Sequence, residues 1–419
     1  MKFNPSMSRR HFLAGSVSIG ALAAMHPFAS LAQANQAHLR ILQTTDLHVA
    51  VFPYDYYADA PNDTMGLART AAIIEQIRAE AGNSMLVDNG DIIQGTPMGD
   101  YMAYEKGLEG NVHPMIAAMN TLGYEAATLG NHEFNYGLDY LDAALAGANF
   151  PFVSANLVRG TTLGDDPTAD DTYIAPYRII EKQLTDGSGA SKTIRVGIIG
   201  FLPPQIMTWD ASHLTGKVAT RDIVETAKAY VPRMRAEGAD LIVALSHSGI
   251  AEDKGPGSEN ASLQLAAVEG IDVVLTGHQH LVFPGPDFTE LEGADIEAGT
   301  LNGKPAVMPG FWGSHMGLID LLLEQDANGK WTVVSHTAEA RPIFERVDGK
   351  VTPLVEDEAE VAAAAQQEHE ETLDYIRRPV GETAAPLHSY FALVADDPSV
   401  QIVSQAQAWY IAHMMKGTE

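Results

Sequence analysis

The fold is decided by the stretch Gly130-Asn131-His132-Glu133 and by four other stretches of the same kind. Each of the five directly follows a short apolar run and carries Asp, Asn or His, which are side chains that bind metal ions. One such stretch alone has an ordinary explanation, such as a turn, a helix cap or a buried histidine. Five of them in one chain indicate a single site. The other four are Thr45-Asp46-Leu47-His48, Asp88-Asn89-Gly90-Asp91, Ser246-His247-Ser248-Gly249 and Gly277-His278-Gln279-His280.

The apolar runs predict β-strands, and segments with apolar residues every three to four positions predict helices between them. This alternation is typical of an α/β fold, in which the carboxyl ends of the strands meet at one edge of a sheet. We therefore expect the five stretches to converge. For the Asp-x-His and His-x-His stretches we expect extended backbone, because it turns alternate side chains to one side. The predicted strands are 39–43, 85–87, 152–155, 194–199, 241–245 and 271–275, and the predicted helices are 68–81, 114–122, 138–146 and 222–237.

The five stretches offer oxygen and imidazole nitrogen as metal ligands, but no sulfur. The chain has no cysteine, which excludes disulfides, thiolate nucleophiles, iron–sulfur clusters and cysteine-bound zinc. A mixed set of oxygen and nitrogen donors suits Zn, Mn, Fe or Co better than Ca, which prefers oxygen throughout. We expect Asp88 and Glu133 to support the ligands rather than to bind a metal themselves.

In their order along the chain, the five stretches resemble the dinuclear metallophosphoesterases of the calcineurin-like fold, whose pattern is D-x-H, G-D, G-N-H-E, a single His, and G-H-x-H. Residues 87–91 and 131–134 resemble more narrowly the bacterial 5′-nucleotidase group of that family. Within the group, the chain looks like the periplasmic enzymes that hydrolyse 2′,3′-cyclic nucleotides and 3′-nucleotides, and this likeness covers nearly all of residues 38–419. It is carried by residues 88–101, 129–140, 203–207 and 309–313. The resemblance implies an α/β layered sandwich with helices outside.

The resemblance also implies a pair of divalent metal ions, which would be Zn, Mn, Co or Fe. The first ion would be held by Asp46, His48 and His280, the second by Asn131, His247 and His278, and Asp91 would bridge the two. A carboxylate suits the bridging position, because its charge offsets the repulsion between two cations that lie roughly 3.5–4 Å apart.

By the same resemblance, His132 acts in catalysis, either by stabilising charge on the phosphoryl oxygens or by protonating the leaving ribose oxygen. In related 5′-nucleotidases an Asp three residues after this His orients it, whereas this chain has Asn135 at that position. An amide accepts a hydrogen bond but carries no charge to stabilise an imidazolium. His132 and Asn135 are therefore the predicted catalytic residues, and Asn135 is where the chain departs from the pattern.

The reaction implied by the resemblance is hydrolysis of 2′,3′-cyclic nucleotides to 3′-nucleotides, and of 3′-nucleotides to nucleoside and phosphate. Nucleotides would then be the substrates. Two alternatives stay open. One is a 5′-nucleotidase or nucleotide-sugar hydrolase with the same metal ligands. The other is a non-catalytic, metal-binding remnant, which would fit Asn135 and the short tail of the chain.

The composition excludes some partners. The chain has 419 residues, with 54 acidic against 26 basic side chains and a net charge of −28. Nucleic-acid polymers and anionic membranes both require a basic surface, so neither is an expected partner. Hydrophobic residues make up 46% of the chain, which is enough for a large packed core.

Residues 1–34 predict a cleavable twin-arginine signal peptide. Arg9 and Arg10 precede an apolar run over residues 12–25, and small residues follow at 29–32. The run is shorter than the roughly 20 residues of a spanning helix, so no stable membrane anchor is expected. The predicted partner is the twin-arginine export machinery, and the predicted location is the periplasm.

Three further segments are expected after the signal peptide. They are a metallophosphoesterase domain over 35–354, a linker helix over 355–379, and the incomplete start of a C-terminal nucleotidase domain over 380–419. In the linker the helix is expected to span 356–377, and a second helix is expected over 399–414, with Asp397 and Pro398 as its cap and first-turn residues. In the resembled family the second domain is much longer, so this chain is expected to lack most of it.

Overall fold

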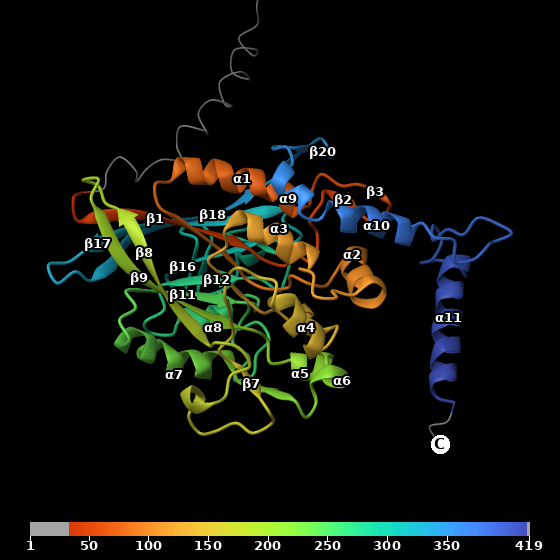
Figure 1. Ribbon diagram of the computed structural model, residues 1–419, viewed down its shortest axis with the longest axis horizontal. Helices are drawn as coiled ribbons and strands as arrows, with labels where there is room; N and C mark the ends of the chain where they lie inside the picture. Colours follow the sequence, from red (N-terminus) through yellow and green to blue (C-terminus); the bar gives the residue numbers. More distant parts are fainter. Residues whose placement is uncertain (1–32, 417–419) are drawn as a thin grey trace, which may run out of the picture. The chain divides into compact units, whose positions relative to one another are not determined.

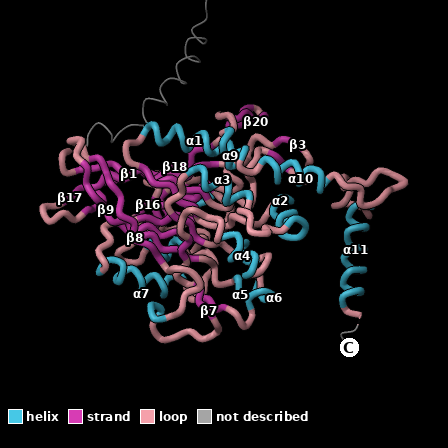
Figure 2. The backbone as a smooth tube through the Cα atoms, in the orientation of Figure 1, coloured by secondary structure: helices cyan, strands magenta, loops and turns pink. Residues whose placement is uncertain are grey.

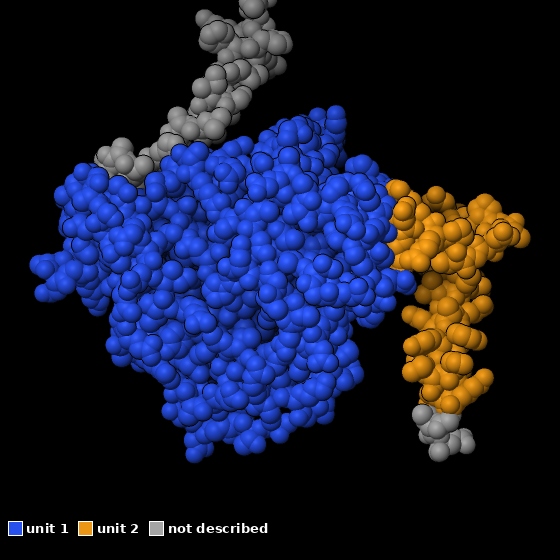
Figure 3. All heavy atoms as spheres, in the orientation of Figure 1, with its two compact units in different colours: residues 1–373 blue, residues 374–419 orange. Residues whose placement is uncertain are grey.

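The computed structural model describes residues 33–416, so the predicted signal peptide lies almost entirely outside the described residues. The chain divides into two compact units, Met1–Leu373 and Asp374–Glu419 (Figure 3). Within residues 33–416, no helix combines the length and the apolar composition that crossing a membrane requires.

Two stacked β-sheets form the centre of the first unit, and helices cover their outer faces (Figures 1 and 2). The first sheet has the strand order β18-β17-β1-β4-β5-β6, in which β1, β4, β5 and β6 run parallel. This arrangement confirms the predicted α/β layered sandwich. The strands of this sheet are β1 (Gln36–Thr44), β4 (Ser84–Asp88), β5 (Ala126–Thr128), β6 (Phe152–Val153), β17 (His315–Gln325) and β18 (Trp331–Pro342).

The second sheet has the order β14-β15-β16-β12-β11-β9-β8, with β13 paired to β16, and its central strands β9, β11, β12 and β16 run parallel. Three short antiparallel pairs lie outside the two sheets. The second sheet contains β8 (Tyr177–Thr185), β9 (Ser191–Phe201), β11 (Leu241–Ser246), β12 (Val273–Thr276), β13 (Val282–Phe283), β14 (Ala294–Asp295), β15 (Thr300–Leu301) and β16 (Lys304–Pro309). The short pairs are β2 (Tyr54–Asp55) with β3 (Ala60–Pro61), β7 (Leu157–Arg159) with β10 (Val218–Thr220), and β19 (Phe344–Val347) with β20 (Lys350–Pro353).

An apolar core lies between the two sheets. Leu241, Val243 and Leu245 of β11 pack there with apolar side chains of β1, β4 and β17. Ile242 and Ala244 point the other way and pack with the outer helix α7 (Ile223–Ala236). A strand that is buried on both faces reads as a continuous apolar run rather than an alternating one. This is why β11 is recognisable from the sequence.

The helices of the first unit lie outside the sheets, and each predicted helix there overlaps an observed one. In Figure 1, α1 lies on one side of the stacked sheets and α7 on the other. Before residue 350 the other helices of four or more residues are α1 (Leu67–Glu80), α2 (Pro97–Tyr101), α3 (Pro114–Leu122), α4 (Leu138–Leu145), α5 (Ile206–Trp209), α6 (Ala211–Leu214) and α8 (Ser262–Ala266), and a π-helical turn spans Met102–Lys106.

The single helix predicted over 356–377 is wrong, because the structure has two helices, α9 (Ala359–Ala363) and α10 (Gln366–Ile376). Val361 and Ala365 are fully buried, and α9 packs against α1 and α3. In α10, by contrast, Glu368 and Glu371 pair with Lys106 at 2.8 and 2.7 Å. Because the helix is broken, the apolar α9 contacts α1 and α3, while the acidic side chains of α10 contact Lys106.

The second unit contains α11 (Pro398–Met414), which agrees with the helix predicted over 399–414. Asp397 caps it, because its Oδ1 accepts a hydrogen bond from the backbone N–H of Ser399 at 3.0 Å. No side chain of α11 is buried.

His113 at the start of α3 predicts acid sensitivity of the fold. Its side chain is fully buried and accepts a hydrogen bond from the backbone N–H of Met115, and burial lowers its pKa to about 3. The unfolded chain takes up the proton near pH 6.5, whereas the folded chain resists it until about pH 3. The free energy of unfolding should therefore fall as the pH falls through this window.

The free energy of unfolding should fall between pH 7 and pH 5 in both wild type and His113→Asn, in which Asn is another good capping residue. The fall should be about 2 kcal/mol smaller in His113→Asn. Urea unfolding of wild type and His113→Asn at both pH values measures this difference. The other titrating groups cancel in the comparison. Equal losses in the two proteins would contradict the assignment.

Candidate metal centre

The five polar stretches follow the carboxyl ends of β1, β4, β5, β11 and β12. The first three strands belong to one sheet and the last two to the other, so the stretches approach from both sheets. Two side-chain amides join the sheets at this point. Gln43 Nε2 donates to the backbone oxygen of Thr276 at 2.7 Å, and Asn89 Nδ2 donates to that of Ser246 at 2.9 Å. The predicted site therefore lies between two sheets.

All of the predicted metal ligands come together there. Three groups of side chains each bring their potential ligand atoms within 4.8 Å of one another: Asp46 with His48 and His280, Asp91 with His247 and His278, and His48 with Asp91 and His132. Asn131 joins them, since its Oδ1 lies 2.8 Å from His278 Nδ1.

In His48 and His247 the hydrogen bonds occupy Nδ1 and leave Nε2 for a metal. The Nδ1 atoms of His48 and His247 lie 2.9 and 2.7 Å from the backbone oxygens of Gln94 and Asn89. A carbonyl oxygen only accepts, so each Nδ1 carries a hydrogen and Nε2 is the nitrogen of each ring that is placed to bind a cation. His48 Nε2 lies 3.0 Å from His280 Nε2. Ring nitrogens this close suit a cation that both bind.

Buried charge points to the same conclusion. Burial alone would lower the pKa of His247, but the carboxylates of Asp91 and Asp46 outweigh it and raise the pKa to about 10. Burial alone would likewise raise the pKa of both carboxyls, yet the neighbouring histidines, His247 foremost, keep each pKa below its usual range. Two buried carboxylates thus attract positive charge. A divalent cation would supply that charge directly, so the residues fit such an ion.

The backbone that carries the ligands differs from the extended conformation we expected. Asp46, His48 and Asp91 have φ values of 51°, 49° and 62°, and His278 and His280 have 72° and 59°. This left-handed region is costly for residues other than glycine, and it is found mainly at functional sites. The paired side chains in Asp-x-His and His-x-His therefore reach the site from tight, left-handed turns, and the expectation of extended segments was wrong.

Asp88 and Glu133 stay outside the three ligand groups. Glu133 is fully buried, and its carboxylate accepts hydrogen bonds from the backbone N–H groups of Asp91, Ile92 and Gly130, at 2.8, 2.6 and 2.6 Å. It thereby ties the stretch after β4 to the stretch after β5. Asp88 accepts from the Thr44 hydroxyl and from the backbone N–H of Gly90.

His278 has a hydrogen-bond partner that the sequence analysis missed. Its Nε2 lies 2.8 Å from the carboxylate of Glu259, while its Nδ1 faces Asn131. A carboxylate on the outer nitrogen of a metal-binding imidazole fixes the ring and raises its basicity. No local pattern marks Glu259, because it lies in the loop between β11 and α8.

We expect Glu259→Gln to weaken metal binding about 10-fold, at the low end of the range for such partners because the carboxylate is partly exposed. Competition with a chelator of known affinity measures this change. Glu252→Gln, an exposed position in the same loop, is the matched control. Equal affinities in both variants would remove Glu259 from the site.

The predicted catalytic residues are also in contact. His132 Nδ1 lies 2.6 Å from Asn135 Oδ1, which leaves the Nε2 of His132 for a substrate. Two aromatic rings flank the ligands. Trp209, with 46% of its surface exposed, stacks on His278, and Phe311 stacks on His280.

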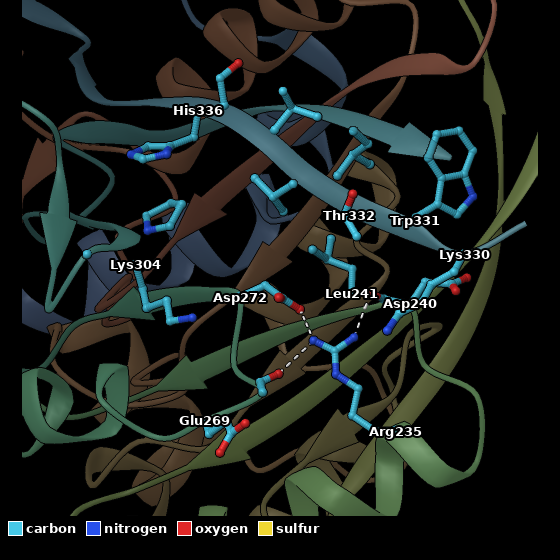
Figure 4. A pocket seen from close by; sticks show the side chains of 17 residues that line it. Arg235, Asp240, Leu241, Glu269, Asp272, Lys304, Lys330, Trp331, Thr332 and His336 are labelled. Atoms are coloured by element: carbon cyan, nitrogen blue, oxygen red, sulfur yellow. Dashed lines mark hydrogen bonds and ion pairs between the residues drawn. The ribbon is translucent and has the colours of Figure 1, made fainter. Parts of the chain in front are cut away.

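A cavity of about 540 Å³ lies elsewhere in the first unit, around the amino ends of β11, β12 and β16 (Figure 4). The guanidinium of Arg235 bonds there to Asp272 and to the backbone oxygens of Asp240 and Gly270. None of the predicted site residues lines this cavity. The hydrogen bonds of Arg235 therefore hold together the segments that precede β11 and β12.

Comparison with known proteins agrees with the geometry. Residues 39–282 match the family model described as calcineurin-like phosphoesterase. The chain belongs to the calcineurin-like phosphoesterase family. This stretch of the chain contains all five polar stretches.

Several members of the calcineurin-like phosphoesterase family are similar to the chain over most of its length. A 2′,3′-cyclic-nucleotide 2′-phosphodiesterase/3′-nucleotidase of Salmonella typhimurium is 47% identical over 93% of this chain and 59% of its own length. Its counterpart from Yersinia enterocolitica is 48% identical over 93% of this chain and 58% of its own length. The chain thus spans about three fifths of these relatives. The crystal structure of the calcineurin-like phosphoesterase YfkN from Bacillus subtilis matches with a TM-score of 0.75 and 45% identity, over 82% of this chain and all of the other.

Proposed function

We propose that the chain hydrolyses 2′,3′-cyclic nucleotides to 3′-nucleotides, and 3′-nucleotides to nucleoside and phosphate, at a pair of divalent metal ions. The observation that carries this proposal is the convergence of the seven predicted ligands between the two sheets, in a chain 47% identical to a relative of that name. Nucleotides would be its substrates.

The chain offers two sets of ligands around one carboxylate. Asp91 Oδ2 lies 3.1 Å from His247 Nε2 and 3.8 Å from His48 Nε2, and so it faces both sets. When bound, Zn, Mn, Co or Fe ions would act as Lewis acids that polarise the phosphoryl group and activate water. The first ion would take Asp46, His48 and His280, the second would take Asn131, His247 and His278, and Asp91 would serve both.

The other residues of the site orient the substrate and move a proton. His132 Nε2 is the ring nitrogen on the side of the metal ligands, so the imidazolium form of His132 would donate its Nε2 hydrogen to the phosphoryl or leaving oxygen and would keep its Nδ1 hydrogen on Asn135. The neutral amide of Asn131 limits the negative charge among the ligands, and this favours entry of an anionic phosphate. The same site would serve both esters, because each step displaces a ribose oxygen from phosphorus.

A substrate panel tests the proposal. Protein loaded with Mn or Co should release phosphate from 3′-AMP and should open 2′,3′-cyclic AMP, and metal analysis should find two ions per chain. His132→Ala, with both ions retained, should be slower by roughly 100-fold or more, which is the usual contribution of a general acid or base. Selective hydrolysis of 5′-AMP would favour a 5′-nucleotidase instead. Full metal content without turnover of any ester, including bis-p-nitrophenyl phosphate, would favour a non-catalytic protein.

We also propose that Arg9 and Arg10 direct the chain through the twin-arginine export machinery to the periplasm. Support comes from the sequence alone. Replacing both arginines by lysine should keep the protein in the cytoplasm, and Lys2→Arg is a control for charge near the terminus. Cell fractionation followed by immunoblotting measures the distribution. Periplasmic recovery of the double variant at the wild-type level would contradict the proposal.

A further inference from the structure

His132 is connected to a buried carboxylate through Asn135. Asn135 Oδ1 lies 2.6 Å from His132 Nδ1, and Asn135 Nδ2 donates to Asp210 Oδ1 at 2.9 Å. Asp210 has only 5% of its surface exposed. These hydrogen bonds link His132 through Asn135 to Asp210. When ionised, the Asp210 carboxylate supplies the negative charge that Asn135 lacks.

The contact with Asp210 decides which way the amide of Asn135 points. An ionised carboxylate only accepts hydrogen bonds, so the NH₂ side of the amide must face Asp210 and the oxygen must face His132. An amide oxygen also only accepts, so His132 Nδ1 must carry the hydrogen and Nε2 is left toward the metal ligands. Without Asp210 the amide could reverse, and it would then offer a donor to His132.

A structural role does not account for the placement of the Asp210 side chain. Asp210 stands at the N-cap position of α6, where an Asp side chain usually bonds to the helix, but its side chain makes no such bond. Its second oxygen, Oδ2, is buried and has no hydrogen-bond partner among the described residues. Among residues 33–416, the carboxylate of Asp210 accepts one side-chain hydrogen bond, which comes from Asn135.

We propose that Asp210 is a positioning residue, which fixes the amide of Asn135 and thereby holds His132 in the tautomer and orientation that the reaction needs. The inference rests on the proposed function. In this arrangement the carboxylate of Asp210 does not contact His132 directly, because the amide of Asn135 lies between the two groups.

An exchange of the two residues tests this proposal. Asp210→Asn keeps the shape but loses both the charge and the fixed amide, and we expect kcat for 3′-AMP to fall about 10-fold with little change in KM. Asn135→Asp alone would set two carboxylates 2.9 Å apart, and it should also be slow. The double variant Asn135→Asp/Asp210→Asn restores every hydrogen bond with the charge moved onto residue 135. It should recover kcat to within about 3-fold of wild type.

A double-mutant cycle separates positioning from a general loss of structure. In a His132→Ala background, Asp210→Asn should have no further effect on kcat, because its target is gone. Asp139→Asn, an exposed carboxylate at the start of α4, is the control for charge. NMR of ¹⁵N-labelled histidine gives a readout besides activity, since the Nδ1–H tautomer of His132 in wild type should mix with the other tautomer in Asp210→Asn.

Three results would overturn the proposal. They are an equal loss from Asp210→Asn with and without His132, failure of a folded and metal-loaded exchange variant to recover, and an unchanged tautomer. If Asp210→Asn does not fold, recovery of a folded, active protein in the exchange variant supports the pairing and its absence rejects it. Turnover by the wild-type enzyme tests the proposed function separately, and wild type without turnover would reject that function. The tautomer of His132 would still test the role of Asp210.

Discussion

Asp91→Asn should lower kcat/KM by roughly 1000-fold, which corresponds to about 4 kcal/mol of transition-state stabilisation. The same variant should bind at most one metal ion per chain. Asp91 is buried to 99% and faces both sets of ligands, at 3.1 Å from His247 Nε2 and 3.8 Å from His48 Nε2. An amide has the same shape as this carboxylate, but it does not offset the repulsion between two cations. Metal analysis and initial rates with 3′-AMP measure the two effects.

Asp88→Asn is the matched control, because Asp88 lies three residues away and is equally buried. Burial raises the pKa of Asp88 well above its usual range and so favours the uncharged form, whereas the neighbouring histidines lower the pKa of Asp91; an amide should therefore be tolerated better at position 88. The Thr44 hydroxyl, which donates to this carboxyl, can reverse its role toward an amide. We expect Asp88→Asn to keep both ions and a rate within about 10-fold of wild type. Two retained ions in Asp91→Asn would contradict the assigned bridge.

Gly130→Ala should lower kcat/KM by about 100-fold or more, or about 2.7 kcal/mol. A Cβ atom at Gly130 would lie 2.2 Å from Asp91 Oδ1 and 2.6 Å from His247 Cε1, so a single methyl group would displace both side chains. The backbone of Gly130 is not in the left-handed region, and the variant therefore tests crowding rather than backbone strain. Kinetics with 3′-AMP and metal content measure the result.

Gly82→Ala is the control for Gly130→Ala. Gly82 also lies outside the left-handed region, and a Cβ atom there would meet nothing within 4 Å. We expect this variant to match wild type in rate and metal content. Wild-type kinetics in Gly130→Ala would mean that Asp91 and His247 can move aside without consequence, which contradicts a tightly built metal centre.

Apolar periodicity predicted most of the central strands and the longer outer helices, because strands such as β11 are buried on both faces and helices such as α3 have clear start and stop signals. It did not predict β5 or β16, which lie inside the two sheets. The antiparallel pair β17 and β18 was not predicted. Most side chains of β18 are only partly buried, and its pairing with β17 contains a bulge between Leu322 and Leu323. Such a strand lacks the continuous apolar run that marks a buried one.

The site divides in the same way. The kinds of candidate ligand and their order, from Asp46 to His280, were readable from the sequence, because each of these residues lies in a short stretch next to an apolar run. The left-handed turns at Asp46 and His278 were not readable, because neither residue type requires positive φ. Nor were the supporting carboxylates, since the hydrogen bond between Asn135 and Asp210 joins residues 75 positions apart.

The sequence by itself determined the type of fold, the candidate metal ligands and the amide of Asn135 three residues after His132. The tertiary structure alone decided that two sheets meet at the site. It also decided that Glu259 contacts His278 and that Asp210 is linked to His132 through Asn135. The physical reason is that strand and helix periodicity is a local property of the chain. The partner of a buried hydrogen-bonding group, by contrast, is set by whichever distant segment the packing of the core brings beside it.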